Sequence, residues 1–275
     1  MASSEAPIGA LMAYRRATWR SRPLPGLVIV GAQKSGTTSL LAYLSQHPQL
    51  VPAVTGTVHF FDGGRRADVD DYAKGESWYR AHFPAARNLG PDSQAFEASP
   101  LYMFHPLVAR RMFELLPHVK IVALLRNPSE RAISHYFHEK RKGREELPIM
   151  QAMEAEEERL APVLRTQDYK NQAFRSYSYK SRGLYLEQLD RFLEHFSREQ
   201  ILLLSSEEFF RRPPRTLKRV FEFVGVDESF NVTDLTPRNV GNRPGVDPGV
   251  YEYLNDYFSQ PNATLSELLG MEFGW

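Results

Sequence analysis

The sequence predicts one α/β domain in which a central parallel sheet is flanked by helices. Three runs, at residues 27–30, 121–125 and 201–204, are entirely apolar, which is typical of parallel strands buried on both faces. Helical patterns follow them, as in α/β folds. The 275 residues are 42% hydrophobic and can bury a full core. We expect an arm or short helix over residues 1–25 and a single domain over residues 26–275.

The composition excludes several classes of protein. A net charge of +1 gives no general attraction to nucleic acid or to an anionic membrane. The absence of cysteine rules out disulfides and thiolate chemistry and fits a reducing compartment. No stretch reaches the roughly 20 apolar residues that span a bilayer, and the start of the chain lacks the order of a signal peptide. We therefore expect a cytoplasmic protein without a membrane span or a nucleic-acid partner.

Residues 27–40 have the pattern of a strand, an anion-binding loop and the start of a helix. The apolar run ends at Gly31, a loop with Lys34 follows, and apolar residues resume at helical spacing after Gly36. Such a loop turns its amides inward, and the helix dipole favours a phosphate or sulfate there. The glycines have Walker A spacing, but that motif needs lysine directly after the second glycine, where this chain has Thr37. The pattern predicts a P-loop-like nucleotide site; the simpler alternative is a glycine turn with a solvated lysine.

Polar residues interrupt an apolar segment at residues 57–62. Thr57 and His59 flank a valine, and two phenylalanines follow; a histidine in such surroundings is by default a core residue. Residues 63–90 carry aromatic side chains without clean periodicity, and we expect loop and short helix at a pocket rim. A strand over residues 94–98 then carries Glu97 just before a Ser-Pro turn.

The strand at residues 121–125 is followed directly by Arg126, and a helix is expected over about residues 128–140. Because open α/β sheets place ligands at the carboxyl ends of parallel strands, Arg126 is a candidate anion ligand. Residues 141–180 are charged and largely helical in pattern. The acidic run at residues 154–158 is expected to form a solvated helix face.

The last third of the chain alternates helical patterns with one long turn-rich segment. An amphipathic helix is expected over residues 182–196 and another helical region over residues 207–224. Residues 236–250 are rich in glycine, proline and asparagine and carry Arg238 and Arg243. This segment is either a lid over an anion or a surface loop.

Three motifs stand in order along the chain: GAQKSGTTSL at residues 31–40, LLRNPSERAISHY at 124–136 and RNVGNRP at 238–244. Together they resemble the sulfotransferases that use 3'-phosphoadenosine 5'-phosphosulfate (PAPS), especially the branch of the heparan sulfate sulfotransferases and related bacterial enzymes. The resemblance covers residues 26–245, with supporting matches at VHFFD, EASPLY and SRGLYLEQL. It implies a P-loop-like sulfotransferase fold and transfer of a sulfuryl group to a hydroxyl or amine of a small-molecule or glycan acceptor. The product would be adenosine 3',5'-bisphosphate, and no metal is implied.

The resemblance also implies roles for individual residues. Lys34 would reach the bridging oxygen of the phosphosulfate, Arg126 and Ser134 would bind the 3'-phosphate, and the loop with Arg243 would close over the nucleotide. Amides and hydroxyls after the lysine would bind the 5'-phosphate; they belong to Ser35, Gly36, Thr37, Thr38 and Ser39. A donor with phosphates at two ends of its ribose needs two separated anion sites, and two strand ends provide them.

One position departs from the resemblance. Glycan-modifying relatives typically carry a glutamate base two residues before the histidine, where this chain has Thr57. A threonine hydroxyl is not a base near neutral pH. In an extended segment Thr57 and His59 would share a face, and histidine has an ordinary pKa of about 6.5. The catalytic candidates are therefore Lys34, His59 and the altered position Thr57, with Glu97 as an alternative base or a brace for its turn.

Two other functions fit parts of the pattern. A kinase-like P-loop enzyme would use the same loop, but it would need magnesium and a lysine directly after Gly36. A protein that binds the nucleotide without catalysis fits the missing glutamate at Thr57.

Overall fold

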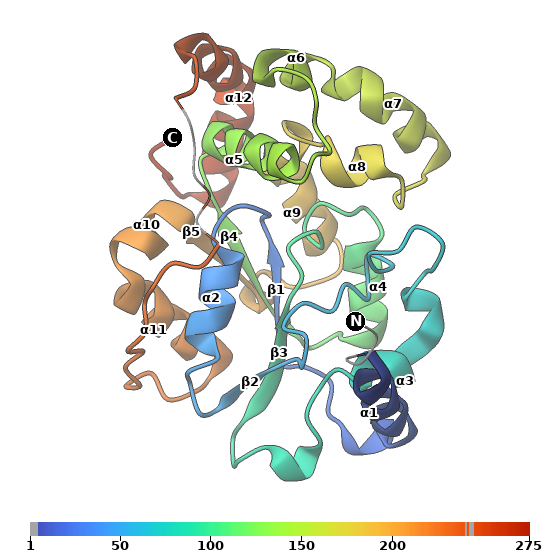
Figure 1. Ribbon diagram of the computed structural model, residues 1–275. Helices are drawn as coiled ribbons and strands as arrows, with labels where there is room; N and C mark the ends of the chain where they lie inside the picture. Colours follow the sequence, from blue (N-terminus) through green and yellow to red (C-terminus); the bar gives the residue numbers. More distant parts are fainter. Residues whose placement is uncertain (1–4, 240, 242–244) are drawn as a thin grey trace.

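Parallel strands form one sheet in the order β2-β3-β1-β4-β5 (Figure 1). The computed structural model describes residues 5–239, 241 and 245–275. The strands are β1 (Leu27–Gly31), β2 (Leu50–Pro52), β3 (Gln94–Ala98), β4 (Lys120–Leu125) and β5 (Ile201–Ser205). Because β1 lies between β3 and β4, the loops that leave the carboxyl ends of these strands are neighbours.

Helices surround the sheet in the described part of the chain. The α-helices are α1 (Glu5–Ala17), α2 (Thr37–Leu44), α3 (Gly75–Arg80), α4 (Val108–Leu115), α5 (Pro128–Arg141), α6 (Ile149–Glu154), α7 (Glu156–Thr166), α8 (Gln172–Ser176), α9 (Tyr185–Leu193), α10 (Ser206–Arg211), α11 (Pro213–Val224) and α12 (Pro248–Leu269). Short 3-10 helices lie at Trp19–Ser21, Tyr72–Lys74, Ala86–Asn88, Ser181–Gly183 and Arg198–Gln200.

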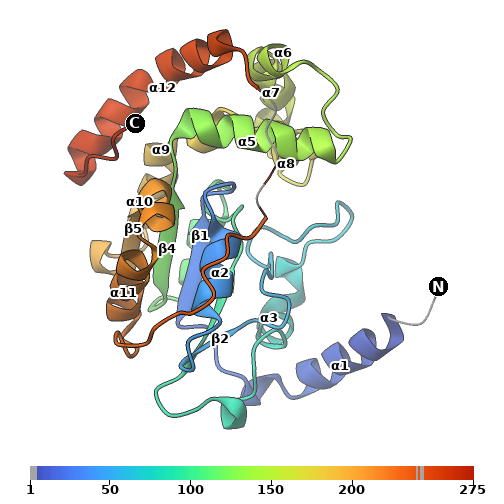
Figure 2. The ribbon, with the colours of Figure 1, turned by 60° about the vertical axis from the view of Figure 1, so that its left-hand side comes forward.

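The side chains of β1 alternate between two apolar layers. Leu27 and Ile29 pack into one layer with residues of α2, α10 and α11, and Val28 and Val30 pack into the other with residues of α3, α4 and α9. The sheet is therefore covered on both faces. A third apolar cluster joins α5, α6 and α12 beyond the carboxyl ends of the strands (Figure 2).

The predicted α/β fold class with a central parallel sheet is confirmed. The apolar runs at 27–30, 121–125 and 201–204 lie in β1, β4 and β5, and the helix expected over residues 128–140 is α5. The prediction missed α12, whose start was assigned to a loop. Asp247 caps this helix by accepting a hydrogen bond from the Gly249 amide at 2.8 Å, and Pro248 occupies its first turn, where proline is well tolerated.

The solvated face expected at residues 154–158 is wrong at Glu156. This side chain is 1% exposed, and its carboxylate accepts hydrogen bonds from the amide and hydroxyl of Ser181 at 2.8 and 2.7 Å and from the amide of Lys180. Burial raises the pKa of Glu156 despite these donors. The carboxylate ties α7 to the segment that leads into α9.

Residues before β1 pack on the domain through arginine side chains. Arg15 and Arg22 donate to the carbonyl of Phe83, Arg22 at 2.9 Å. Within the described ranges, no helix combines the length and apolar content required to cross a bilayer.

Four histidines are held neutral by the fold. Burial lowers the pKa of His82, His105 and His138 to about 4 and that of His135 well below its ordinary value. Between about pH 6.5 and 4 the unfolded chain binds protons that the folded chain does not. Stability is therefore lost as the pH falls through this window, by up to roughly 1.4 kcal/mol per pH unit for each histidine.

We expect His82→Phe to reduce the loss of folding stability at low pH. In the described structure neither ring nitrogen of His82 has a hydrogen-bond partner, and the ring lies 4.4 Å from that of Trp78, so phenylalanine suits the site. Urea unfolding at pH 7, 6 and 5 measures the free energy of unfolding. Below pH 6, this free energy should fall less steeply with pH in His82→Phe than in the parent, by about 1 kcal/mol per pH unit. The exposed His118→Gln is the matched control. Equal slopes for His82→Phe and the parent would contradict the assignment.

Candidate functional site

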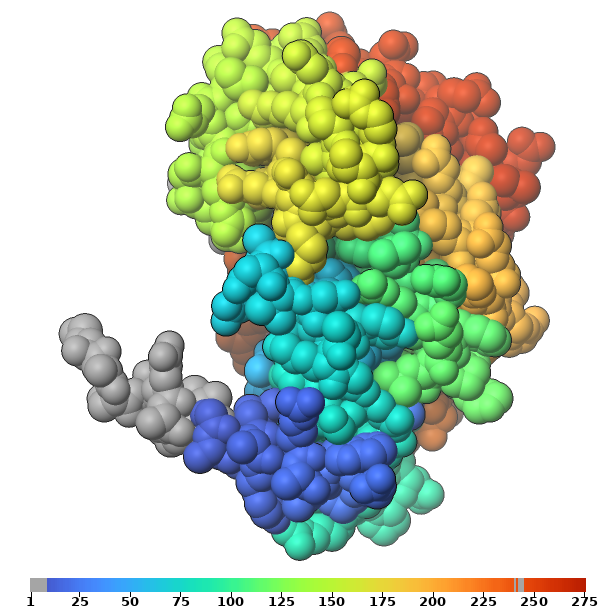
Figure 3. Space-filling model, turned by 90° about the vertical axis from the view of Figure 1, so that its right-hand side faces the viewer, coloured from blue at the N-terminus to red at the C-terminus, as the bar shows by residue number. Residues whose placement is uncertain are grey.

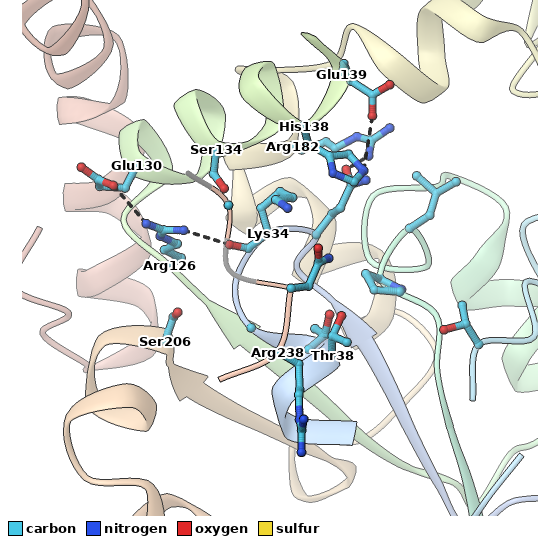
Figure 4. Close-up of a pocket in the computed structure, with 18 of the residues that line it drawn as sticks. Lys34, Thr38, Arg126, Glu130, Ser134, His138, Glu139, Arg182, Ser206 and Arg238 are labelled. Carbon is cyan, nitrogen blue, oxygen red and sulfur yellow. Dashed lines mark hydrogen bonds and ion pairs between the residues drawn. The ribbon is translucent and has the colours of Figure 1, made fainter. Parts of the chain in front are cut away.

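A cleft of about 950 Å³ opens at the carboxyl ends of β1 and β4 (Figure 4). Its volume is near the upper end of the roughly 300–1,000 Å³ that is usual for ligand sites. Segments far apart in sequence form its walls: the loop after β1, residues 57–65, α5, the segment between α8 and α9, and the loop after α11. This is the edge of an open sheet where ligands bind.

The loop after β1 has the geometry of an anion cradle. Lys34 (φ 74°) and Gly36 (φ 100°) adopt left-handed conformations, and α2 begins at Thr37. Gly36 is the N-cap and has no side chain, so the first amides of α2 remain available to a ligand. A Cβ atom at Gly36 would lie 2.7 Å from the ring of Phe210, so glycine is required for both φ and space. Lys34, Gly36, Thr37 and Thr38 line the cleft.

Ser35 and Ser39 are part of the same loop but do not line the cleft. Both side chains are fully buried. The Ser39 hydroxyl accepts a hydrogen bond from the amide of Arg238 at 2.8 Å, and the Ser35 carbonyl accepts one from the Ser206 hydroxyl at 2.8 Å. Both residues therefore connect the loop to its neighbours, and the contact of their amides and hydroxyls with a 5'-phosphate stays a prediction.

Arg126 follows β4 and lies beside the cradle. Its Nη1 donates to the carbonyl of Lys34 at 3.1 Å, and its Nη2 pairs with Glu130 at 3.0 Å. Ser134 lies one turn beyond Glu130 on the same face of α5, and all four residues line the cleft. Figure 4 shows Lys34 between Arg126 on one side and His138 on the other. The structure thus brings together the two strand ends that were predicted to meet.

The loop after α11 runs along α2 (Figure 2), and its residues Pro237, Arg238 and Asn239 line the cleft. Arg238 lines the cleft and forms an ion pair with Asp234. Gly241 lies so close to α5 that a Cβ atom there would be 3.0 Å from Arg141. Arg243, which was predicted to close over the nucleotide, lies outside the described residues.

Thr57 and His59 both line the cleft, but their segment is not extended as predicted. His59 adopts a left-handed conformation (φ 58°), and its Nδ1 lies 2.6 Å from Oδ2 of Asp62, which is 1% exposed. Burial alone would raise the pKa of Asp62, but the charge and hydrogen bond of His59 hold it below its ordinary value. A carboxylate at Nδ1 favours the tautomer in which Nε2 is the proton acceptor.

Glu97 lies behind this segment and does not line the cleft. Its carboxylate is fully buried and accepts hydrogen bonds from the Tyr79 hydroxyl at 2.8 Å, the Ser99 hydroxyl at 2.6 Å and the Val58 amide at 3.3 Å. The Ser99 hydroxyl accepts in turn from the His59 amide at 3.0 Å. Burial raises the pKa of Glu97. Glu97 therefore acts as the brace that was one of its two predicted roles.

His138 and Glu139 line the cleft but were not identified from the sequence. His138 is one turn beyond Ser134, so the i, i+4 spacing of a helix was a usable signal. Its Nε2 lies 3.7 Å from Oε1 of Glu139. Burial and the charges of Lys34 and Lys142 lower the pKa of His138 to about 4, so the ring is neutral at pH 7.

Basic side chains form the wall beyond Lys34, and the sequence analysis assigned none of them to the site, although Arg182 lies in the SRGLYLEQL match. They are Arg65, Lys142, Arg144, Arg175 and Arg182. Arg182 is 2% exposed and donates to the Ser178 hydroxyl at 2.7 Å and the Phe174 carbonyl at 3.0 Å. Burial and the charge of Arg131 lower its pKa to about 9, so the guanidinium stays charged at pH 7. These residues come from separate segments, and only the fold brings them together.

Residues 63–64 are hydrogen-bonded to the segment around α8. Arg175 and Lys170 donate to the carbonyl of Gly64 at 2.5 and 2.9 Å. Figure 3 shows the yellow α7–α8 segment directly above the cyan segment that contains residues 63–64. The contact fixes the wall that carries Arg65.

The lining of the cleft is strongly basic. Among the described residues that line it, eight lysines and arginines face three glutamates, so anions concentrate there although the whole chain is nearly neutral. The aromatic side chains of residues 63–90 do not form its rim as predicted: Tyr79 and Phe83 are buried in the core, and Tyr72 and Trp78 pack against it. In the described ranges no cluster of three or more His, Asp or Glu side chains could hold a metal ion.

Residues 24–237 match the family described as Sulfotransferase domain. The chain is 32% identical over 212 residues to the bifunctional heparan sulfate N-deacetylase/N-sulfotransferase 1 of Caenorhabditis elegans, covering 75% of this chain and 23% of the relative. It is 29% identical over 279 residues to the human heparan sulfate glucosamine 3-O-sulfotransferase 3B1, covering 93% of this chain and 66% of the relative. The crystal structure of a sulfotransferase from Alicyclobacillus acidocaldarius superimposes with a TM-score of 0.73 and 31% identity, covering 91% of this chain and 97% of that one.

Proposed function

The chain belongs to the family of proteins with a sulfotransferase domain, and from this premise we propose that it transfers a sulfuryl group from PAPS to a hydroxyl or amine of an anionic acceptor. The main support for PAPS as the donor is that two anion-binding elements lie next to each other. The cradle after β1 and Arg126 after β4 meet at the hydrogen bond from Arg126 to the Lys34 carbonyl.

The donor fits these elements in one orientation. The amides of Gly36, Thr37 and Thr38 suit the 5'-phosphate, while Arg126 and Ser134 suit the 3'-phosphate. Phe210 lines the cleft beside Gly36 with 43% of its surface exposed, and its flat apolar ring suits a purine. The sulfate end then points past Lys34 toward His59 and the basic wall.

The reaction breaks the bond between sulfur and the bridging oxygen and forms a bond from sulfur to the acceptor atom. Lys34 donates a hydrogen bond to the bridging oxygen as negative charge develops there, which is the type of interaction that accelerates the chemical step. The cradle and Arg126 hold the donor so that the acceptor can attack in line. A base must take the acceptor proton.

His59 is the best-supported base. It lines the cleft next to Thr57, and Asp62 holds its ring with Nε2 as the acceptor nitrogen. Thr57 cannot take the proton, and Glu97 is occupied by its buried donors. His138 is the second candidate, but its pKa of about 4 makes it a much weaker base.

Features of the site also bear on the two alternatives. A kinase-like reaction would use a lysine directly after Gly36, and this chain has Thr37 there. A nucleotide-binding protein without catalysis would need no oriented base, whereas the His59–Asp62 pair lies in the part of the cleft toward which the proposed donor's sulfate would point.

The charge of the basic wall supports an anionic acceptor. Desolvation and the charges of Arg144 and Arg65 lower the pKa of Lys142, and Arg65 and Arg144 also oppose the charge on Arg175. Mutual repulsion of this kind is relieved by a bound anion. The human relative is named for heparan sulfate glucosamine, and a glycan with carboxylate or sulfate groups fits the same description.

The first prediction from the proposed function concerns binding and reaction of the donor. Arg126→Ala should weaken binding of adenosine 3',5'-bisphosphate by about 1.5 to 3 kcal/mol, because a charged hydrogen-bond partner of the 3'-phosphate is lost. Lys34→Ala should lower kcat about 10²-fold or more, because a transition-state donor is lost. Calorimetry and steady-state rates measure both, with the exposed Arg110→Ala on α4 as control.

The same titration tests the proposed function as a whole. The parent protein should bind adenosine 3',5'-bisphosphate much more tightly than ATP. Equal affinity for the two, or unchanged affinity in Arg126→Ala, would count against a PAPS site.

The second prediction concerns the base. His59→Ala should lower kcat by about 10²- to 10⁴-fold, and Thr57→Glu should raise it by supplying a carboxylate. Rates with one common acceptor measure both, with exposed His118→Ala as control. A fully active His59→Ala protein, or a Thr57→Glu protein no faster than the parent, would mean that the proton leaves by another route; His138→Ala then tests the second candidate.

The third prediction concerns the acceptor. An oligosaccharide of alternating glucosamine and uronic acid should be a better acceptor than a chito-oligosaccharide of equal length. Arg65→Gln and Lys142→Gln should each raise KM for the anionic glycan by about 2- to 5-fold, as exposed ion pairs do, without raising it for the neutral one. Arg110→Gln is the matched control. Equal KM changes for both glycans would refute the charge assignment.

A further inference from the structure

Residues 270–275 turn back from the end of α12 toward α10 and the adjoining cleft. The rings of Phe273 and Trp275 stack with centroids 4.4 Å apart. The Trp275 Nε1 donates to Oε2 of Glu207 at 3.3 Å, and its ring centroid lies 5.8 Å from that of Tyr185. Trp275 therefore contacts two residues that belong to other parts of the chain.

Glu207 and Tyr185 hold the backbone at the end of β4. Oε1 of Glu207 accepts a hydrogen bond from the Asn127 amide at 2.8 Å, and the Tyr185 hydroxyl donates to the Arg126 carbonyl at 2.7 Å. Tyr185 is 2% exposed, and Glu207 lines the cleft. Trp275 is thus linked to the backbone of residues 126 and 127 through two residues. It donates a hydrogen bond to Glu207, which accepts from the Asn127 amide, and its ring contacts Tyr185, which donates to the Arg126 carbonyl.

Part of this corner is open on the side of α12, although the Tyr251 hydroxyl on α12 donates to Glu130 at 3.2 Å. A second cavity of about 540 Å³ lies between α12 and residues 272–275, and Asn127 lines it together with Asn255 and Trp275. A cavity provides no packed atoms that would resist a shift of the backbone. At this open side the backbone of residues 126 and 127 is held by the hydrogen bond from the Asn127 amide to Glu207 and by the one from the Tyr185 hydroxyl to the Arg126 carbonyl.

We propose that Trp275 is a positioning residue of the donor site: it holds Glu207 and Tyr185 in place, and through them it keeps the Arg126 guanidinium aligned with the 3'-phosphate. The proposal rests on the proposed function, since it assigns the 3'-phosphate to Arg126. Trp275 itself does not touch the donor. Its effect should appear only in the part of the binding energy that Arg126 supplies.

The test compares two nucleotides that differ in the 3'-phosphate alone. Calorimetry with adenosine 3',5'-bisphosphate should show binding about 3- to 10-fold weaker for Trp275→Ala than for the parent, a loss typical of coupled neighbours. Binding of adenosine 5'-phosphate should change less than about 2-fold. Trp275→Phe retains the ring but lacks the donor to Glu207, and it should fall between the parent and Trp275→Ala. The exposed Leu268→Ala on α12 is the matched control.

A double-mutant cycle separates positioning from a general structural role. In an Arg126→Ala background, Trp275→Ala should have almost no further effect on the bisphosphate, because the contact that it aligns is absent. Equal losses for both nucleotides, or a full additional loss in that background, would overturn the proposal, as would unchanged bisphosphate affinity in Trp275→Ala. If Trp275→Ala does not fold, unchanged affinity in Trp275→Phe overturns it. A parent that binds neither nucleotide would instead refute the proposed donor site.

Discussion

Buried carboxylates that accept hydrogen bonds from backbone amides hold the loops around the cleft. Loops have no ladder partners, and an unpaired buried amide costs about 1–3 kcal/mol. A carboxylate satisfies such amides with charge-assisted hydrogen bonds, even though burial raises the pKa of Glu97 and Glu156. The buried carboxylates that act in this way are Asp62, Glu97 and Glu156, which accept hydrogen bonds from the amides of residues 64, 58 and 181. The half-buried Glu207 accepts one from the amide of residue 127. These hydrogen bonds connect the loops around the cleft to the neighbouring elements.

Local sequence patterns were sufficient for the sheet and for the cradle. Apolar runs identified β1, β4 and β5, and the spacing of Gly31, Lys34 and Gly36 identified the loop. They failed where a residue's role depends on distant partners. The left-handed backbone of His59 follows from hydrogen bonds to Ser99 and Asp62, and no periodicity encodes it. The basic wall is likewise invisible in sequence because its members converge only in the fold.

The part of the chain beyond residue 237, where the family match ends, also contributes to the cleft. The Tyr251 hydroxyl on α12 donates to Glu130 at 3.2 Å, and Glu130 pairs with Arg126. Trp275 donates to Glu207 behind the same arginine. The sequence analysis assigned the start of α12 to a loop, so it had no means of connecting this region with Arg126. The part of the cleft around Arg126 is therefore supported from both sides of the β4–α5 junction.

Thr57 stands where the resemblance to glycan-modifying sulfotransferases leads us to expect a glutamate, and the proposed reaction assigns the proton acceptor to the neighbouring His59 instead. In the proposed reaction a carboxylate at residue 57 would supply a second proton acceptor, and the basic lining of the cleft would offset its negative charge. A neutral imidazole takes a proton without bringing a negative charge. The Asp62 carboxylate that orients His59 is 1% exposed and lies on the far side of the ring's Nδ1. In the proposed reaction the ring of His59 therefore separates the charge of Asp62 from the acceptor, and the basic wall lines the same cleft.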